Sequence, residues 1–158
     1  MKIEELYKIY TLSPFICIDS RNTTNNSLFF ALKGERFNGN QFASKAIQSG
    51  CKFAIIDEEQ YKSENCILVE NVLETLQSLA KYHRQQLNIP IIGITGTNGK
   101  TTTKELTYSI LSSSYNVYAT KGNLNSQIGL PLSILEINKS HDIAVIEMGA
   151  NKIGEIKK

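Results

Sequence analysis

Apolar and polar positions in the first half of the chain predict short strands that alternate with helices. Four apolar runs have the length and composition of strands: 15–18, 27–32, 52–56 and 67–70. A helix pattern over about 41–48 is ended by Gly50, and a longer one over about 72–87 ends before Pro90. The predicted buried face of the longer helix consists of Val72, Leu76, Leu79, Ala80 and His83.

From residue 89 the pattern changes to a regular succession of strands, loops and helices. Apolar runs at 89–94, 116–120 and 143–147 predict strands, with helices over 103–111 and from Pro131 between them. This order is typical of a parallel sheet. The predicted fold class is α/β: a small N-terminal domain, 1–88, is followed by the start of a parallel-sheet domain, 89–158.

The loop after the 89–94 strand has the residues needed to hold a nucleoside triphosphate. Glycines let its backbone turn tightly and approach a phosphate, although their spacing departs from the strict P-loop pattern. Lys100 can reach the β- and γ-phosphates, and Thr101 offers a hydroxyl to Mg²⁺. A glycine-rich turn with a solvated lysine is the disfavoured alternative. The predicted phosphate-binding residues are Gly96, Thr97, Asn98, Gly99, Lys100, Thr101 and Thr102.

Glu147 is the predicted acid of the metal site. It ends the 143–147 strand, so its carboxylate is expected at the sheet edge on which the glycine loop also lies. Together with the Thr101 hydroxyl it offers the hard oxygen ligands that suit Mg²⁺. A charged strand cap is the alternative, and the turn that follows, Met148 to Asn151, favours the metal-binding interpretation.

Two further loops could bind substrate. Asn123 and Asn125 follow the 116–120 strand and should face the same crevice, although loops rich in Asn and Gly are often plain exposed turns. In the first half, arginines beside glycine-containing loops could hold a second anionic ligand, with solvated surface charges as the alternative. The residues concerned are Ser20, Arg21 and Arg36.

Composition narrows the classes of function. The chain of 158 residues is 41% hydrophobic, enough for a core, and its 17 basic and 15 acidic residues are mixed, so no basic stripe favours nucleic acid. The 3 cysteines show no C-x-x-C spacing, which favours a reducing, cytoplasmic setting. No signal peptide or membrane-spanning run is evident, and neither histidine has neighbours at metal-ligand spacing.

The order and spacing of these segments resemble the Mur ligase family over nearly the whole chain, and most closely its members that add D-alanyl-D-alanine. The resemblance implies an ATP-dependent amide ligation with Mg²⁺, in which a carboxylate of UDP-N-acetylmuramoyl-tripeptide is phosphorylated and the amine of D-alanyl-D-alanine attacks the acyl phosphate. It implies catalytic roles for Lys100 and Glu147, and a loop at Asn123 and Asn125 that faces the nucleotide peptide. The residues that it implies in contact with the UDP-sugar are Ser20, Arg21, Gly34, Arg36 and Phe37. The matching segments are Asp19–Arg21, 28–39, 93–102, 120–131 and 146–151.

Family members continue well beyond residue 158, so we expect the N-terminal portion of such a ligase, inactive without the missing C-terminal part of the enzyme. Three alternatives stay open. The chain could be a non-catalytic module that binds the UDP-linked peptide, another ligase of this type or a folylpolyglutamate synthase, or a small P-loop kinase or GTPase. The last is disfavoured because the front-domain motifs would have no role in it.

Overall fold

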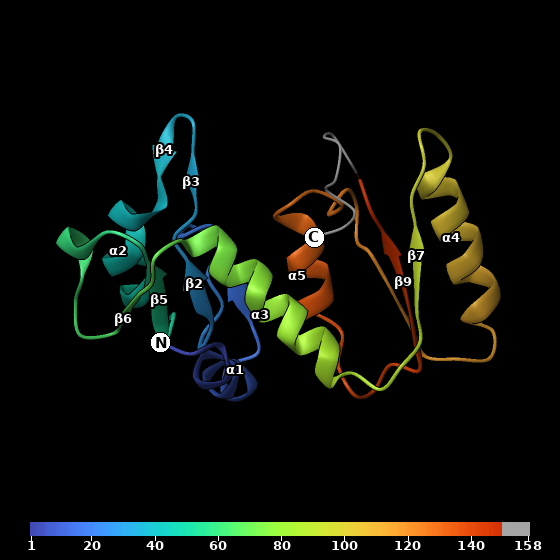
Figure 1. Cartoon of the computed structure of the whole chain (residues 1–158), viewed down its shortest axis with the longest axis horizontal. Coiled ribbons are helices and arrows are strands. Elements are labelled where there is room, and N and C mark those ends of the chain that lie inside the picture. Colours follow the sequence, from blue (N-terminus) through green and yellow to red (C-terminus); the bar gives the residue numbers. More distant parts are fainter. Residues whose placement is uncertain (150–158) are drawn as a thin grey trace. The chain divides into compact units, whose positions relative to one another are not determined.

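The computed structural model of the chain describes residues 1–149, and the chain divides into two compact units between Tyr82 and His83. Helix α3 (Val72–Gln86) carries the chain from the first unit into the second. Each unit has helices and a parallel sheet, which confirms the predicted α/β class (Figure 1). Within the described range, no helix combines the length and the apolar composition needed to cross a membrane.

A four-stranded parallel sheet forms the centre of the first unit. All residues of its second strand are buried, as expected for an inner strand of a parallel sheet. The predicted strands are confirmed, each in a shorter form. In sheet order they are β1 (Ile16–Cys17), β2 (Leu28–Phe30), β5 (Phe53–Ile56) and β6 (Cys66–Leu68).

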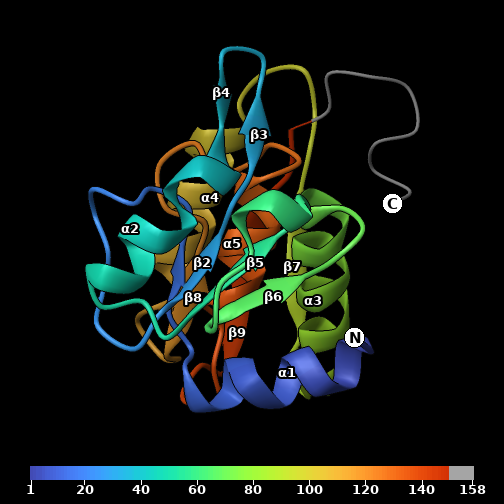
Figure 2. The same cartoon turned by 90° about the vertical axis from the view of Figure 1, so that its left-hand side faces the viewer.

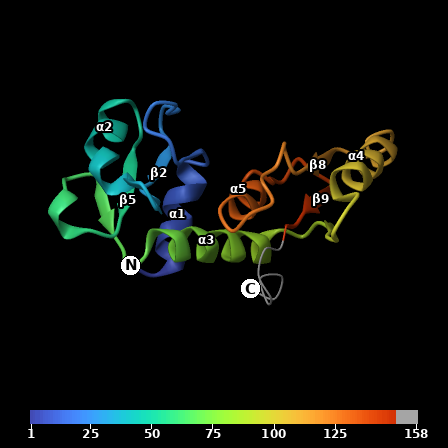
Figure 3. The same ribbon diagram turned by 90° about the horizontal axis from the view of Figure 1, so that it is seen from above.

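Helices lie on both sides of this sheet (Figure 3). On one side α2 (Ala43–Gln48), preceded by the 3-10 turn η1 (Gly39–Phe42), packs its alanines against Phe29 and Ala54. Leu28 and Phe30 alternate to the other face, along which α1 (Ile3–Leu12) and the first turns of α3 run. The predicted buried face of α3 is confirmed in full.

Helix α1 was not predicted, because its apolar signal is weak. Its buried residues are Leu6 and Tyr10, one helical turn apart, so only a narrow stripe of the helix faces the core. Another short 3-10 turn, η2 (Glu59–Tyr61), has no buried residue and was also missed.

An antiparallel hairpin, β3 (Lys33–Gly34) and β4 (Phe37–Asn38), extends beyond the end of β2 (Figure 2). The sequence did not predict it, because two-residue strands leave no periodic signal. At its base Gly39 lies directly against the backbone of Leu32, where a Cβ would collide with the Leu32 carbonyl oxygen. The hairpin is therefore anchored by a close backbone approach that requires glycine.

The second unit contains a three-stranded parallel sheet, as predicted. Its strands are β7 (Ile91–Ile94), β8 (Val117–Ala119) and β9 (Ile143–Glu147), and β9 lies between the other two. Helix α4 (Lys100–Leu111) covers one face and α5 (Gly129–Leu135) the other (Figure 1). α4 begins at Lys100 rather than at the predicted Thr103, because Gly99 already forms its N-cap.

The core of this unit lies on the α5 side of the sheet and includes Tyr118, Ile137 and Ala144. On the outer strand and on α4, large apolar side chains stay exposed: Ile92 is 38% exposed, Leu106 61% and Ile110 72%. Among the described residues, these exposed apolar side chains lie on β7 and on α4.

Candidate functional site

The strand order of the second unit brings three chain segments to one edge of its sheet. Parallel strands end at the same edge of a sheet. The glycine loop (95–99) follows β7, the asparagine loop (120–128) follows β8, and Glu147 ends β9. Because β9 is the middle strand, Glu147 lies between the two loops. The sheet topology therefore gathers the residues predicted for nucleotide and metal binding.

Glu147 is held by a hydrogen bond on each carboxylate oxygen. Its Oε2 accepts from the Thr101 hydroxyl at 3.0 Å and its Oε1 accepts from the Asn125 amide at 2.8 Å, while the residue is only 2% exposed. A hydroxyl beside a carboxylate is a pair of hard oxygen ligands, so Thr101 and Glu147 fit Mg²⁺. Among residues 1–149 no cluster of three or more His, Cys, Asp or Glu side chains could hold a metal alone. A Mg²⁺ ion here would complete its shell with phosphate oxygens and water.

The glycine loop leaves open space for an anion. Gly96 and Gly99 have φ angles of 141° and 78°, in the region that L side chains rarely adopt. Nothing beyond its chain neighbours lies within 4 Å of where a Cβ of Gly99 would stand. In the described part of the chain, the backbone N–H groups of Thr97 and Asn98 donate to no other backbone group. Donors at the start of a helix favour a bound phosphate.

Lys100 lies over this loop and donates from Nζ to the Gly96 carbonyl at 2.8 Å. Its ammonium is thus held beside the same backbone whose N–H groups are open. Thr101 and Thr102 follow on the exposed first turn of α4. The predicted phosphate-binding residues therefore form one continuous surface from the loop into the helix.

The asparagine loop divides into an exposed and a half-buried part. Asn123 is exposed, whereas Asn125 bonds Glu147 with its side chain and accepts from the Gly149 N–H with its carbonyl at 2.8 Å. The contact of Asn125 with the carboxylate was not predicted. The later residues of the predicted turn, Ala150 and Asn151, lie outside the described residues.

Two buried polar residues that sequence reasoning missed also contact this cluster. Lys104 donates from Nζ to the Thr120 carbonyl at 2.8 Å, and the Thr120 hydroxyl accepts from the Glu147 N–H at 3.0 Å. Lys104 is 1% and Thr120 2% exposed. The sequence spacing could have identified Lys104, because it follows Thr101 by three positions and therefore lies on the same face of the helix.

The predicted residues of the first unit follow β1 and β2, at the carboxyl edge of the other sheet. Arg21 is exposed and pairs with Asp19 at 2.7 Å, and its hydrogen bonds lower the pKa of Asp19 to about 2. Ser20 between them is buried. Within residues 1–149 the structure shows no hydrogen bond or ion pair between this turn and the hairpin.

Gly34, Arg36 and Phe37 lie together on the hairpin and are all exposed. The Phe37 ring lies against Gly34, where a Cβ would collide with it, and is 57% exposed. An exposed aromatic ring beside an arginine can accept a flat anionic ligand.

A group of polar residues anchors this hairpin to the sheet. Lys33 pairs with Asp57 and with Glu58 at 2.9 Å each, directly after β5. Asn40, 1% exposed, donates to Asp57 at 2.8 Å and accepts from its N–H at 2.9 Å. Burial alone would raise the pKa of Asp57, but the hydrogen bonds from Lys33, Asn40 and the Val72 N–H outweigh it and lower that pKa.

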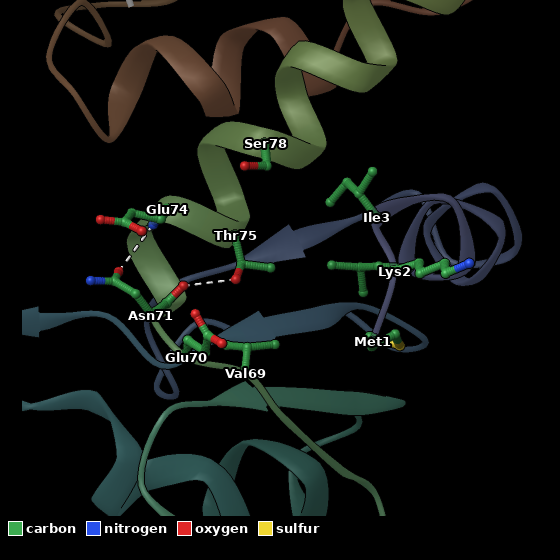
Figure 4. Close-up of a pocket in the computed structure, with 10 residues that line it drawn as sticks. Met1, Lys2, Ile3, Val69, Glu70, Asn71, Glu74, Thr75 and Ser78 are labelled. Carbon is green, nitrogen blue, oxygen red and sulfur yellow. Dashed lines mark hydrogen bonds between the residues drawn. The ribbon is translucent and has the colours of Figure 1, made fainter.

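A hollow of about 380 Å³ lies elsewhere in the first unit, between the start of α1 and the start of α3 (Figure 4). Its polar groups bond one another: the Glu74 N–H donates to the Asn71 side chain at 3.0 Å, and the Thr75 hydroxyl to the Asn71 carbonyl at 2.7 Å. None of the predicted site residues lines it. This hollow is therefore distinct from the candidate site.

Comparison with known protein families matches two successive parts of the chain. Residues 14–86 match the family described as "Mur ligase family, catalytic domain", and residues 94–158 match the "Mur ligase middle domain". The two matches together leave only short segments of the chain uncovered.

Three similar proteins are UDP-N-acetylmuramoyl-tripeptide–D-alanyl-D-alanine ligases. That of Bacillus subtilis is 41% identical over 144 residues, 89% of this chain and 32% of that protein. That of Borreliella burgdorferi is 43% identical over 168 residues, 98% and 36% respectively. That of Escherichia coli is 38% identical over 141 residues, 89% and 31%. The chain thus spans about a third of the length of these relatives.

Comparison with solved structures also finds Mur ligases. A crystal structure of MurF from Acinetobacter baumannii superposes with a TM-score of 0.84 at 40% identity, over 89% of this chain and 31% of that one. MurF ligase from Thermotoga maritima in complex with ADP gives 0.81 at 36% identity, over 89% and 33%. The matches in sequence and in structure extend over both units, and we conclude that the chain belongs to the Mur ligase family.

Proposed function

We propose that the chain carries the substrate-binding and nucleotide-binding parts of an ATP-dependent ligase of peptidoglycan precursor synthesis. The ligase adds D-alanyl-D-alanine to UDP-N-acetylmuramoyl-tripeptide, the reaction named for the relatives above. One observation carries the proposal: Glu147, bonded to Thr101, stands between an open glycine loop and the asparagine loop. Such a cluster suits the transfer of a phosphoryl group from ATP.

The proposed reaction has two steps. A substrate carboxylate oxygen attacks the γ-phosphorus of ATP, which gives an acyl phosphate and ADP. The amine of D-alanyl-D-alanine then attacks the acyl carbon, loses a proton, and phosphate leaves. Lys100 and the open N–H groups of the glycine loop would stabilise the charge on the transferring phosphoryl group.

Thr101 and Glu147 would hold Mg²⁺, which when bound supplies positive charge to the phosphate oxygens. The Asn125 amide keeps one carboxylate oxygen of Glu147 in place, and the exposed Asn123 would contact the substrate.

Residues 1–88 would form the domain that binds the UDP-linked peptide, and 89–158 the first part of the ATP-binding domain. Ser20, Arg21, Gly34, Arg36 and Phe37 would contact the UDP-sugar. Their position supports this assignment, because they follow the carboxyl ends of neighbouring parallel strands, where ligands of α/β sheets bind. All three cysteines are free, in keeping with a proposed cytoplasmic setting.

Isothermal titration calorimetry of the chain with UDP-N-acetylmuramoyl-tripeptide and with MgATP tests both sites separately. We expect binding of each, with MgATP binding weakened in Lys100→Ala. A second candidate, a module that binds the UDP-linked peptide without ligase chemistry, is favoured by the separate sheet and core of the first unit. Peptide binding without MgATP binding would support that module and refute the ligase proposal. For the protein encoded by the whole reading frame, sustained ADP release over many turnovers should require both UDP-N-acetylmuramoyl-tripeptide and D-alanyl-D-alanine.

A further inference from the structure

Lys104 is a buried cation next to the proposed nucleotide site. Its residue exposure is 1%, although it stands on α4, the helix that the glycine loop opens. Removing an ammonium group from water is costly, and the cost is offset only by good hydrogen bonds to its protons. One partner is the Glu105 carboxylate at 2.9 Å, whose side chain is 62% exposed, and the other is the buried Thr120 carbonyl at 2.8 Å.

The Thr120 contact closes a ring of hydrogen bonds. Lys104 donates to the carbonyl of Thr120, the hydroxyl of Thr120 accepts from the N–H of Glu147, and the carboxylate of Glu147 accepts from Thr101. Thr101 and Lys104 stand one turn apart on the same face of α4, which completes the ring through the helix. The ring joins α4 to the ends of β8 and β9.

The ring provides the hydrogen-bond acceptor for the backbone N–H of Glu147, in addition to the pairing of Glu147 with β7. Without Lys104, the carbonyl of Thr120 would lose its buried donor, and the end of β8 would be free to turn that group toward water. The Thr120 hydroxyl would move with it and release the Glu147 N–H. Glu147 would keep its pairing with Ile94 of β7 and the carboxylate contacts with Thr101 and Asn125, but its backbone N–H would lose its partner at the end of β8.

We infer that Lys104 is a positioning residue for the metal-binding carboxylate. It touches neither nucleotide nor metal. It acts through Thr120 to hold Glu147 at the distance from Thr101 that lets both bind one Mg²⁺ ion. The inference rests on the proposed function, since it assigns a role within the same site.

The test is a titration of nucleotide affinity against Mg²⁺ with Lys104→Met, which keeps an unbranched side chain one atom shorter and removes the ammonium. Lys139→Met, at an exposed loop lysine, is the matched control. Lys104→Met should need about 10- to 100-fold more Mg²⁺ to reach half-maximal affinity, the range found for residues that orient metal ligands. Affinity for ADP without metal should change less than threefold, because the glycine loop is untouched.

Thr120→Val provides an independent arm, because it removes the hydroxyl of the ring and leaves the carbonyl for Lys104. The same increase in the Mg²⁺ requirement is expected, and the double variant should be no worse than the more severe single one. If Lys104→Met fails to fold, the Mg²⁺ titration of Thr120→Val tests the inference by itself.

An unchanged Mg²⁺ requirement in the folded variants would overturn the role of Lys104, as would an equal loss of affinity with and without metal. If the wild-type chain binds no MgATP, the proposed function itself fails and the inference fails with it. If instead the wild-type chain binds MgATP and the Lys104→Met variant has a normal Mg²⁺ titration, only the role of Lys104 fails.

Discussion

Replacing Glu147 by Gln removes the charge of the proposed metal ligand and keeps its shape. The glutamine can still accept from Asn125 with its carbonyl oxygen, while its amide donates to the Thr101 hydroxyl, which can reverse its role. Both hydrogen bonds of the carboxylate therefore have a replacement. We expect the free energy of unfolding to change by less than about 1 kcal/mol.

Metal binding should respond far more strongly. Altering a residue that only orients a metal ligand weakens affinity by about 10- to 100-fold. Removing the negative charge from the ligand itself should therefore cost at least about 100-fold, which corresponds to about 2.8 kcal/mol. The glutamine amide also occupies the hydroxyl of Thr101 as a donor, so both proposed ligands are affected at once.

The assay is calorimetric titration of ADP at Mg²⁺ concentrations from micromolar to tens of millimolar, together with thermal melts. Glu64→Gln, in an exposed loop of the first unit, controls for the loss of one negative charge. A Glu147→Gln protein with the wild-type Mg²⁺ dependence would refute the argument and leave Glu147 as a carboxylate that caps its strand. A collapse of the melting temperature would refute the claim that the glutamine replaces both hydrogen bonds.

Three more results are expected. Lys100→Ala should weaken MgATP binding by roughly 10- to 100-fold, the loss of a hydrogen bond to a charged group, without lowering the melting temperature; calorimetry with normal MgATP affinity would contradict its assigned role. The pKa of Asp57 is lowered by its hydrogen bonds, so the stability it contributes is complete above the usual aspartate pKa of 3.8 and is lost as pH falls below it. The free energies of unfolding of Asp57→Asn and wild type should therefore differ at pH 7 and converge as pH falls progressively below 3.8, and a constant difference would be evidence against the hairpin anchor. Burial lowers the pKa of His83 from 6.5, so the unfolded chain takes up its proton first and stability should fall as pH drops through 6.5; His83→Gln should flatten that pH dependence, and an unchanged slope would show that another group causes it.

Elements with a long or fully apolar pattern were predictable from the sequence. The strand Ile143–Glu147 and the helix Val72–Gln86 were found within a residue or two of the expected positions. The glycine loop was recognisable because each of its residues has a separate chemical reason to be there. The hairpin was not, since its strands have two residues each and Gly39 is explained only by a tertiary contact with Leu32.

Buried polar contacts were the second kind of feature that the sequence could not predict. Lys104 looks like an ordinary helix lysine in the sequence, and only the position of β8 shows that its ammonium is enclosed. In the same way, Asn125 was predicted in a substrate loop, and its hydrogen bond with Glu147 depends on where two strands end. Contacts between residues distant in sequence decide both roles.

The order of the three strands in the second sheet is the decisive fact for the site. Alternating strands and helices predict a parallel sheet but leave its order open, and with the order β7-β8-β9 Glu147 would end an outer strand. Strands lie about 4.8 Å apart, so the carboxylate would then be about 10 Å from the end of β7. A hydrogen bond of 3.0 Å between Thr101 and Glu147 is possible because β9 pairs directly with β7. The late strand inserted between two earlier ones thus turns a nucleotide loop and a distant carboxylate into a single candidate metal site.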